Sequence, residues 1–161
     1  MRIVHPSTDE LWAAYLACRF RSLYAPYDLP ETCTTSELDH PRDRPGVVHR
    51  AALDDAGAVI GVGRIDEQPG SAYGHAAQLR YFAVDAAARA GGVGRTLLGR
   101  LEDDARAWGC VYLWMEARDE ALGFYARAGY ETLGPGPTKW DLIPHHVMGK
   151  PLTPNADAAS A

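Results

Sequence analysis

Apolar positions recur along the chain at two spacings, one typical of strands and one typical of helices. Alternation and short apolar runs predict strands at 2–4, 47–53, 58–66, 76–84, 111–115, 130–133 and 143–148. Spacings of three and four residues predict helices at about 7–23, 95–108 and 121–128. The chain therefore mixes strands and helices, as an α/β protein does.

The first predicted helix has a start signal and an apolar stripe. Ser7 and Glu10 stand at capping-box spacing at its beginning. Its stripe consists of Leu11, Trp12, Tyr15, Leu16 and Leu23. Arg19 and Arg21 fall off this stripe, so we expect them to point away from the face that packs on a sheet.

Proline and glycine mark the first connections. Four prolines between residues 25 and 45 predict a long loop, which leaves room for a short helix at about 34–38. Gly57 suits the turn of an antiparallel hairpin between 47–53 and 58–66.

The second half of the chain is punctuated in the same way. The segment 69–71 is expected to break the chain, and Gly109 and Gly129 are expected to end the second and third helices. The apolar run at 111–115 predicts a strand buried on both faces, as for a strand with a parallel neighbour. A glycine and proline loop at 134–137 is expected between the last two strands.

Composition limits the class of protein. The 161 residues are 47% hydrophobic and 23% charged, which fits one globular domain. We assign this domain to 1–152 and expect a flexible tail at 153–161. A net charge of −5 without a long basic run argues against a nucleic-acid partner.

Apolar segment lengths and cysteine spacing lead to expectations about location and metal content. No apolar segment approaches the roughly 20 residues that cross a bilayer, and the N-terminus lacks a signal-peptide pattern. We therefore expect a cytoplasmic protein without a membrane partner. Its three cysteines are scattered and lack metal-ligand spacing, so we expect reduced thiols and no metal site.

The most informative local feature is the turn Arg89-Ala90-Gly91-Gly92-Val93-Gly94, between a predicted strand and a predicted helix near Arg95. Free backbone amides and the positive end of a helix dipole both favour an anion such as phosphate. Glycines allow the anion to approach the backbone closely, and Arg89 and Arg95 add positive charge. The turn therefore predicts a phosphate site.

Other glycine-rich turns differ from this one. A dinucleotide site requires Gly-x-Gly-x-x-Gly and a distant acidic residue, and a nucleoside-triphosphate loop requires a lysine that this segment lacks. A turn that only starts a helix, without any ligand, stays open on the evidence of this segment alone.

Two motifs in order resemble the GNAT superfamily of acyl-CoA-dependent N-acyltransferases. The segment 84–98 resembles the family motif Arg/Gln-x-x-Gly-x-Gly/Ala, which follows the fourth strand. The segment 117–130 resembles the second signature, a helix with the pattern Ala-x-x-Phe/Leu-Tyr-x-x-x-Gly-Phe/Tyr. Shorter stretches at 61–64 and 143–148 resemble the ElaA-like group of small bacterial acetyltransferases.

This resemblance covers about residues 45–152. It implies a mixed, mostly antiparallel twisted sheet of six to seven strands, flanked by about four helices and splayed between the fourth and fifth strands. It also implies acetyl-CoA as co-substrate and an amine as acceptor. The oligomeric state stays open, with a homodimer as the candidate.

The resemblance assigns roles to individual residues. The amides of Phe82, Ala83 and Val84 are expected to meet the pantetheine arm and the acyl oxygen, and the backbone from Arg89 to Arg95 the pyrophosphate. Tyr125 is expected to donate a proton to the departing thiolate, since a phenol with a pKa near 10 is protonated at pH 7. The remaining coenzyme contacts are expected at Arg118 and Phe124, although many members have asparagine in place of Arg118.

The general base is not fixed by the resemblance. A lysine-like amine costs about 4.6 kcal/mol to deprotonate at pH 7, so a base is needed. Several members use a glutamate at a position that corresponds to Gln78, which cannot accept the proton. Glu116 and His145 are the remaining candidates, directly or through water, and a purely structural role for each stays open.

The sequence thus predicts transfer of an acetyl group from acetyl-CoA to a primary amine of a small molecule or peptide, by direct attack. The alternative is a catalytically degenerate acyl-CoA sensor, which Gln78 favours and the intact Tyr125 opposes. The acceptor amine and the acyl chain length are not determined.

Overall fold

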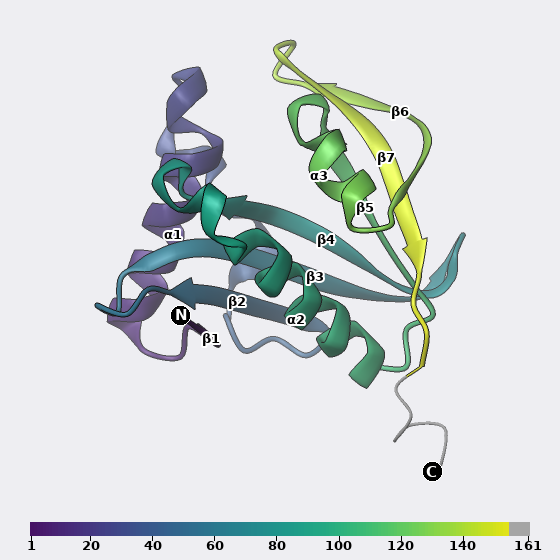
Figure 1. The fold of residues 1–161 in the computed structure, drawn as a ribbon, viewed down its shortest axis with the longest axis horizontal. Coiled ribbons are helices and arrows are strands. Elements are labelled where there is room, and N and C mark those ends of the chain that lie inside the picture. Colours follow the sequence, from purple (N-terminus) through teal and green to yellow (C-terminus); the bar gives the residue numbers. More distant parts are fainter. Residues whose placement is uncertain (155–161) are drawn as a thin grey trace. The chain divides into compact units, whose positions relative to one another are not determined.

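Seven strands are hydrogen-bonded in the order β1-β2-β3-β4-β5-β7-β6 (Figure 1). They are β1 (Arg2–Val4), β2 (Val47–Leu53), β3 (Val59–Ser71), β4 (Gly74–Val84), β5 (Tyr112–Arg118), β6 (Glu131–Lys139) and β7 (Ile143–Pro151). The pairs β1–β2, β2–β3, β5–β7 and β6–β7 are antiparallel, whereas β4 and β5 run parallel. This mixed, mostly antiparallel sheet confirms the predicted fold class.

Helices connect the strands. The α-helices are α1 (Asp9–Leu23), α2 (Val93–Ala107) and α3 (Leu122–Arg127). The 3-10 helices are η1 (Ala25–Tyr27), η2 (Glu31–Cys33), η3 (Glu37–Asp39), η4 (Ala86–Gly91) and η5 (Asp119–Ala121). Three of these short helices lie in the proline-rich segment, which confirms a long connection without a long helix.

The structure is a computed structural model that describes residues 1–154, so most of the predicted tail, 155–161, lies outside the described residues. The chain divides into two compact units. The first comprises 1–66 and 81–103, and the second comprises 67–80 and the chain from 104 onward. The prediction of one domain over 1–152 stays a prediction.

In the first unit, two helices pack on opposite faces of β2 and β3. The α1 face contributes Trp12, Tyr15 and Cys18 to a buried cluster with Ala51, Leu53, Val59, Val62 and Ala83. On the other face, a Cβ atom at Gly63 would lie 2.6 Å from a methyl carbon of Leu101 in α2. Successive residues of a strand point to opposite faces, so Val62 packs against α1 and Gly63 lies against α2.

The second unit contains the parallel pair. Its register runs from Ala76↔Tyr112 to Leu79↔Met115, whereas β4 continues to Val84 and β5 to Arg118. The shared register thus ends before either strand does, and the splay between them stays a prediction.

The first helix differs from prediction at its start and on its buried face. The N-cap is Thr8, whose hydroxyl accepts from the amide of Leu11 at 3.1 Å, so the predicted Ser7–Glu10 capping box is wrong by one residue. Arg19 is fully buried, which contradicts its predicted outward position. It stands four residues after the buried Tyr15 and therefore shares its face of the helix.

Two strand boundaries and the burial of a third strand were also predicted wrongly. β3 continues through 69–71, beyond its pairing with β2, which ends at Asp66. β6 includes 134–137, because it is a bulged edge strand, and such strands tolerate glycine and proline. β5 alternates buried and half-buried residues, so it is not buried on both faces. The turn between β6 and β7 instead contains Trp140 and Asp141, both with positive φ.

Candidate active site

The end of β4 lies in the first unit and contains a backbone irregularity. Tyr81 has a φ of 52°, in the left-handed region that few residues other than glycine adopt. The three residues with expected acyl contacts, Phe82, Ala83 and Val84, follow directly, and the last two are buried. The predicted backbone site therefore begins at a kink in the strand.

Asp85 fixes the start of the glycine-rich turn. Arg21 donates to its carboxylate from Nε at 3.0 Å and from Nη2 at 2.8 Å, and Ser22 Oγ donates at 3.3 Å. The amide of Asp85 donates to the carbonyl of Ile60 on β3 at 2.8 Å. The turn thus starts from a point that is tied to both α1 and β3.

Gly92 ends the turn and α2 begins at Val93, two residues before the predicted start at Arg95. Gly92 has a φ of 75°, which L side chains rarely adopt. The amides of Val93, Gly94 and Arg95 occupy the first helical turn, where no carbonyl of the helix can accept from them. A Cβ atom at Gly91 or Gly92 would meet no atom within 4 Å. The helix start is therefore open to an anion.

The two arginines of the turn differ in their environment. Arg89 Nε donates to the carbonyl of Val84 at 3.1 Å, which directs this side chain toward the end of β4. Arg95 is exposed in the first turn of α2. Both place positive charge near the turn.

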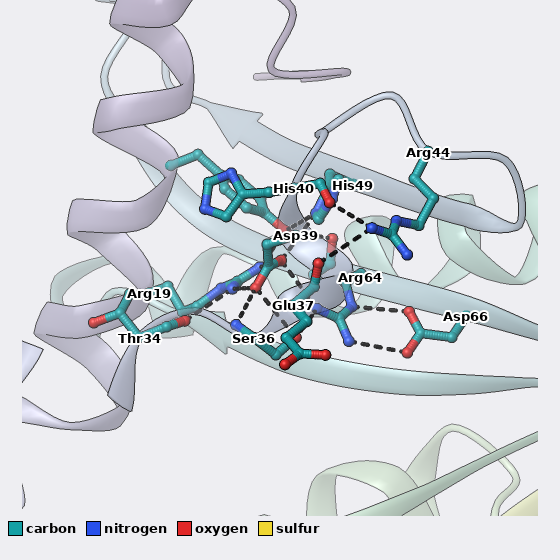
Figure 2. A network of polar contacts seen from close by, with 12 residues as sticks. Arg19, Thr34, Ser36, Glu37, Asp39, His40, Arg44, His49, Arg64 and Asp66 are labelled. Carbon is teal, nitrogen blue, oxygen red and sulfur yellow. Dashed lines mark hydrogen bonds and ion pairs between the residues drawn. The ribbon is translucent and has the colours of Figure 1, made fainter. Parts of the chain in front are cut away.

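A group of charged residues in the same unit is buried. Hydrogen bonds and ion pairs join them (Figure 2). Asp39 from η3 pairs with Arg19 at 3.0 Å and with Arg64 at 3.0 Å, and Arg64 also pairs with Asp66 at 2.8 Å. Burial favours neutral Asp39, but Arg19 holds the pKa of this carboxyl below its usual value. Burial lowers the pKa of His49 to about 3, so this neighbour is neutral at pH 7.

Tyr125 lies on α3 in the second unit. Its side chain is only 5% exposed, and its ring is in edge contact with Phe124 at 5.1 Å and Tyr130 at 5.8 Å between centroids. Burial raises the pKa of the Tyr125 phenol. The hydroxyl therefore holds its proton more tightly than a phenol in water.

The two predicted base candidates share one face of the second unit. Arg118 and His145 are direct partners across β5 and β7, and Glu116 stands two residues before Arg118. Lys139 Nζ lies 3.4 Å from Glu116 Oε2 and balances its charge. The structure thus brings together Glu116, Arg118 and His145.

His145 has a defined tautomer. Its Nδ1 lies 2.8 Å from the carbonyl oxygen of Ile143, which can only accept, so Nδ1 carries the proton. Nε2 then carries the lone pair. Burial lowers the pKa of His145, so the imidazole is neutral at pH 7 and can accept a proton.

Gln78 belongs to a chain of hydrogen bonds on the same unit. Its Oε1 accepts from Gln68 Nε2 at 2.9 Å and from Arg80 Nη2 at 2.8 Å, while Gln68 Oε1 accepts from Trp114 Nε1 at 2.9 Å. The side chain at the position of the family glutamate therefore holds neighbouring side chains in place.

Comparisons with known proteins agree with this geometry. The family model described as "Acetyltransferase (GNAT) family" matches residues 9–130. The chain belongs to the acetyltransferase (GNAT) family. A relative from Azospirillum brasilense, described as "IAA acetyltransferase", is 34% identical over 104 residues, which are 60% of this chain and 63% of that protein. The chain thus matches less than two thirds of this relative's length.

Solved structures share the GNAT fold across nearly the whole chain. An aminoglycoside 6'-N-acetyltransferase complexed with coenzyme A has a TM-score of 0.76 at 17% identity, over 98% of this chain and 100% of that one. A GCN5-related N-acetyltransferase from Kribbella flavida has a TM-score of 0.72 at 23% identity, over 94% and 97%. At these identities the likeness concerns the fold.

The prediction of a GNAT acetyltransferase with acetyl-CoA as co-substrate is confirmed at the level of the family. The ElaA-like subgroup and the roles of the individual residues stay predictions. Among residues 1–154, no helix is long and apolar enough to cross a membrane, and no group of three or more His, Cys, Asp or Glu side chains could hold a metal.

The sequence reading of this GNAT chain missed several residues. Arg19 and Arg64 were not recognised, although Arg19 follows Tyr15 by one helical turn. His146 Nδ1 lies 2.6 Å from Asp119 Oδ1, a pair of residues 27 apart that no local pattern reveals. The kink at Tyr81 had no sequence signal, because aromatic residues rarely adopt positive φ.

Proposed function

We propose that this chain transfers an acetyl group from acetyl-CoA to a primary amine of a small molecule or peptide. The observation that carries the proposal is the left-handed Gly92 between the end of β4 and the start of α2, within the family match over 9–130. This turn gives an anion site where the family motif requires one.

We assign most of the coenzyme contacts to the backbone of the first unit. The pyrophosphate binds the amides from Arg89 to Arg95, and the amides of Phe82, Ala83 and Val84 bind the pantetheine arm and the acyl oxygen. Amides fixed in place before the reaction stabilise the oxyanion without reorganising. Arg118 and Phe124 supply further coenzyme contacts.

The reaction is a direct attack. The amine nitrogen bonds to the thioester carbonyl carbon, the carbon–sulfur bond breaks, the amine loses a proton and the thiolate gains one. Tyr125 donates to the departing thiolate the proton that this sulfur gains. Because burial raises its pKa, hydrogen-bond donation to the developing thiolate is favoured over early proton release.

His145 is the base that accepts the amine proton, directly or through water. Its Nδ1 is occupied by the carbonyl of Ile143, so Nε2 is the accepting atom. Glu116 on the same face stabilises the imidazolium that forms, as an acidic neighbour does for other catalytic histidines. Gln78 does not take part in proton transfer.

The test combines binding and turnover. Calorimetry with acetyl-CoA measures coenzyme affinity, and thiol release is followed with a panel of amines that includes aminoglycosides, because a structural neighbour acts on them. We expect binding and thiol release with at least one amine. Binding without turnover on a broad panel would support the acyl-CoA sensor instead, and absence of binding would refute both.

A further inference from the structure

Tyr81 adopts a conformation that needs an explanation. A non-glycine residue at a φ of 52° is strained, and it persists only where its surroundings hold it there. The residue precedes Phe82, Ala83 and Val84, whose amides are proposed to bind the acyl oxygen. Any change of the backbone at Tyr81 would therefore reorient these amides.

Two arginine side chains contact the Tyr81 ring. The guanidinium carbon of Arg19, from α1, lies over the ring at 4.2 Å from its centroid, and that of Arg64, from β3, lies at 4.9 Å. Cations within about 6 Å of a ring face are attracted by its quadrupole, and more strongly where water is excluded. Arg19 is 0% and Arg64 1% exposed, so both cations are shielded from water, and the Tyr81 residue is half-buried.

The arginines are themselves fixed by acidic partners. Asp39 bridges them, with one carboxylate oxygen 3.0 Å from Arg19 Nη1 and the other 3.0 Å from Arg64 Nη1 (Figure 2). The Asp66 carboxylate accepts hydrogen bonds from Nε and Nη2 of Arg64, at 2.8 and 2.9 Å. Such two-point pairing fixes the plane of a guanidinium and not only its position.

Other residues of the proline-rich segment also bind both arginines and Asp39. Arg19 Nη1 donates to the carbonyl of Thr34 at 2.9 Å, and the amide of Ser36 donates to Asp39 at 2.7 Å. Arg64 Nη1 donates to Ser36 Oγ at 2.9 Å. The segment 34–39 and the kink of β4 are therefore held by the same two arginines.

We propose that Arg19 and Arg64 are positioning residues that hold the Tyr81 ring, and through it the kink that aims the Phe82, Ala83 and Val84 amides at the acyl oxygen. They act through Tyr81 and touch no reacting atom. The inference rests on the proposed function of these amides, and it adds the residues that place them.

The first readout does not depend on activity. Amide hydrogen exchange is measured at Phe82, Ala83 and Val84 in the full chain. Tyr81→Phe keeps the ring and should exchange as the wild type does. Tyr81→Asn tolerates positive φ but lacks a ring, so it should exchange at least about tenfold faster at these amides. Equal exchange in wild type and Tyr81→Asn would overturn the proposal.

The second readout is kinetic. Tyr81→Asn should lower kcat about tenfold and leave the acetyl-CoA dissociation constant within about twofold, because the turn from Arg89 to Gly94 is unchanged. Tyr81→Phe should keep kcat. An unchanged kcat in Tyr81→Asn, or an equal loss in Tyr81→Phe, would overturn the positioning role.

Two further outcomes keep the proposals separate. If Tyr81→Asn does not fold, Tyr81→Leu fills the space without an aromatic face and is expected to give the same two changes. If the wild type shows no turnover but the three amides exchange faster in Tyr81→Asn, the proposed function fails. The role of the Tyr81 ring in holding the backbone is then still supported.

Discussion

At the scale of single residues, the pKa values of Tyr125 and His145 both differ from those in water, and they differ in opposite directions. Burial raises the pKa of the phenol and lowers that of the imidazole. Both shifts favour the neutral form at pH 7. One group is then ready to donate a hydrogen bond and the other to accept a proton.

Replacement of the Tyr125 hydroxyl should affect turnover more than binding. Tyr125→Phe keeps the ring contacts with Phe124 and Tyr130 and removes only the donor to the sulfur. We expect kcat to fall about 100-fold, with little change in acetyl-CoA affinity by calorimetry. A rate equal to that of the wild type would remove the catalytic assignment.

The proposed base should appear in the pH profile. Burial lowers the pKa of His145, so the imidazole gains its proton only at a pH below the ordinary value of 6.5. The pH profile of kcat/KM should therefore show an acid limb with its midpoint below that value. His145→Gln should remove this limb and lower kcat/KM about 100-fold. Glu116→Gln should keep the limb at a lower rate. A limb that disappears in Glu116→Gln and persists in His145→Gln would reverse the two roles.

At the scale of elements, the connection from β4 to α2 depends on one backbone conformation. Gly92 has a φ of 75° and open space around it, so an added Cβ atom costs conformational strain and causes no clash. The strain of about 1 to 2 kcal/mol is relieved most readily by turning the peptide groups that face the anion.

Gly92→Ala should therefore weaken acetyl-CoA binding about tenfold in calorimetry. Gly57→Ala is the matched control, since Gly57 also has a positive φ of 87° and nothing within 4 Å of its Cβ position, but lies in the β2–β3 hairpin. This control should lose similar stability and keep full coenzyme affinity. Equal affinity loss in both variants would show a general effect on folding.

The elements also show where sequence patterns are reliable. The order and type of the main strands and helices followed from apolar spacing, and Gly57, Gly109 and Gly129 all have the positive φ of the turns they were expected to make. The ends of β3 and β6 did not follow. β3 extends beyond its pairing with β2 and has β4 as its other neighbour, and β6 pairs with β7 as far as Lys139. Pairing of this kind is not a local property of the sequence.

At the scale of the whole molecule, the buried charges of the first unit link its stability to pH. His49 binds a proton only near pH 3 when folded, whereas an unfolded histidine binds one near 6.5. Between these values the unfolded chain holds more protons. The free energy of unfolding should therefore fall as the pH falls below 6.5.

Denaturant unfolding at several pH values measures this loss. His49 contributes at most about 1.4 kcal/mol per pH unit between pH 6.5 and 3. Asp39 adds a loss in the same direction at lower pH, because its folded pKa is also below the ordinary value. In His49→Gln the free energy of unfolding should fall less steeply between pH 6 and 4, by at most about 1.4 kcal/mol per pH unit. An identical slope in both proteins would contradict the buried neutral histidine.

The sequence by itself determined the glycine turn, the helix with Tyr125 and the family to which they belong. Such features depend on neighbours within a few residues, through strand and helix periods and through the backbone freedom of glycine. Only the tertiary structure decided that Arg19 is buried, that Asp39 bridges it to Arg64, and that Tyr81 bends β4. These residues are brought together from α1, η3, β3 and β4, and a buried charge becomes tolerable only when partners from distant segments arrive with it.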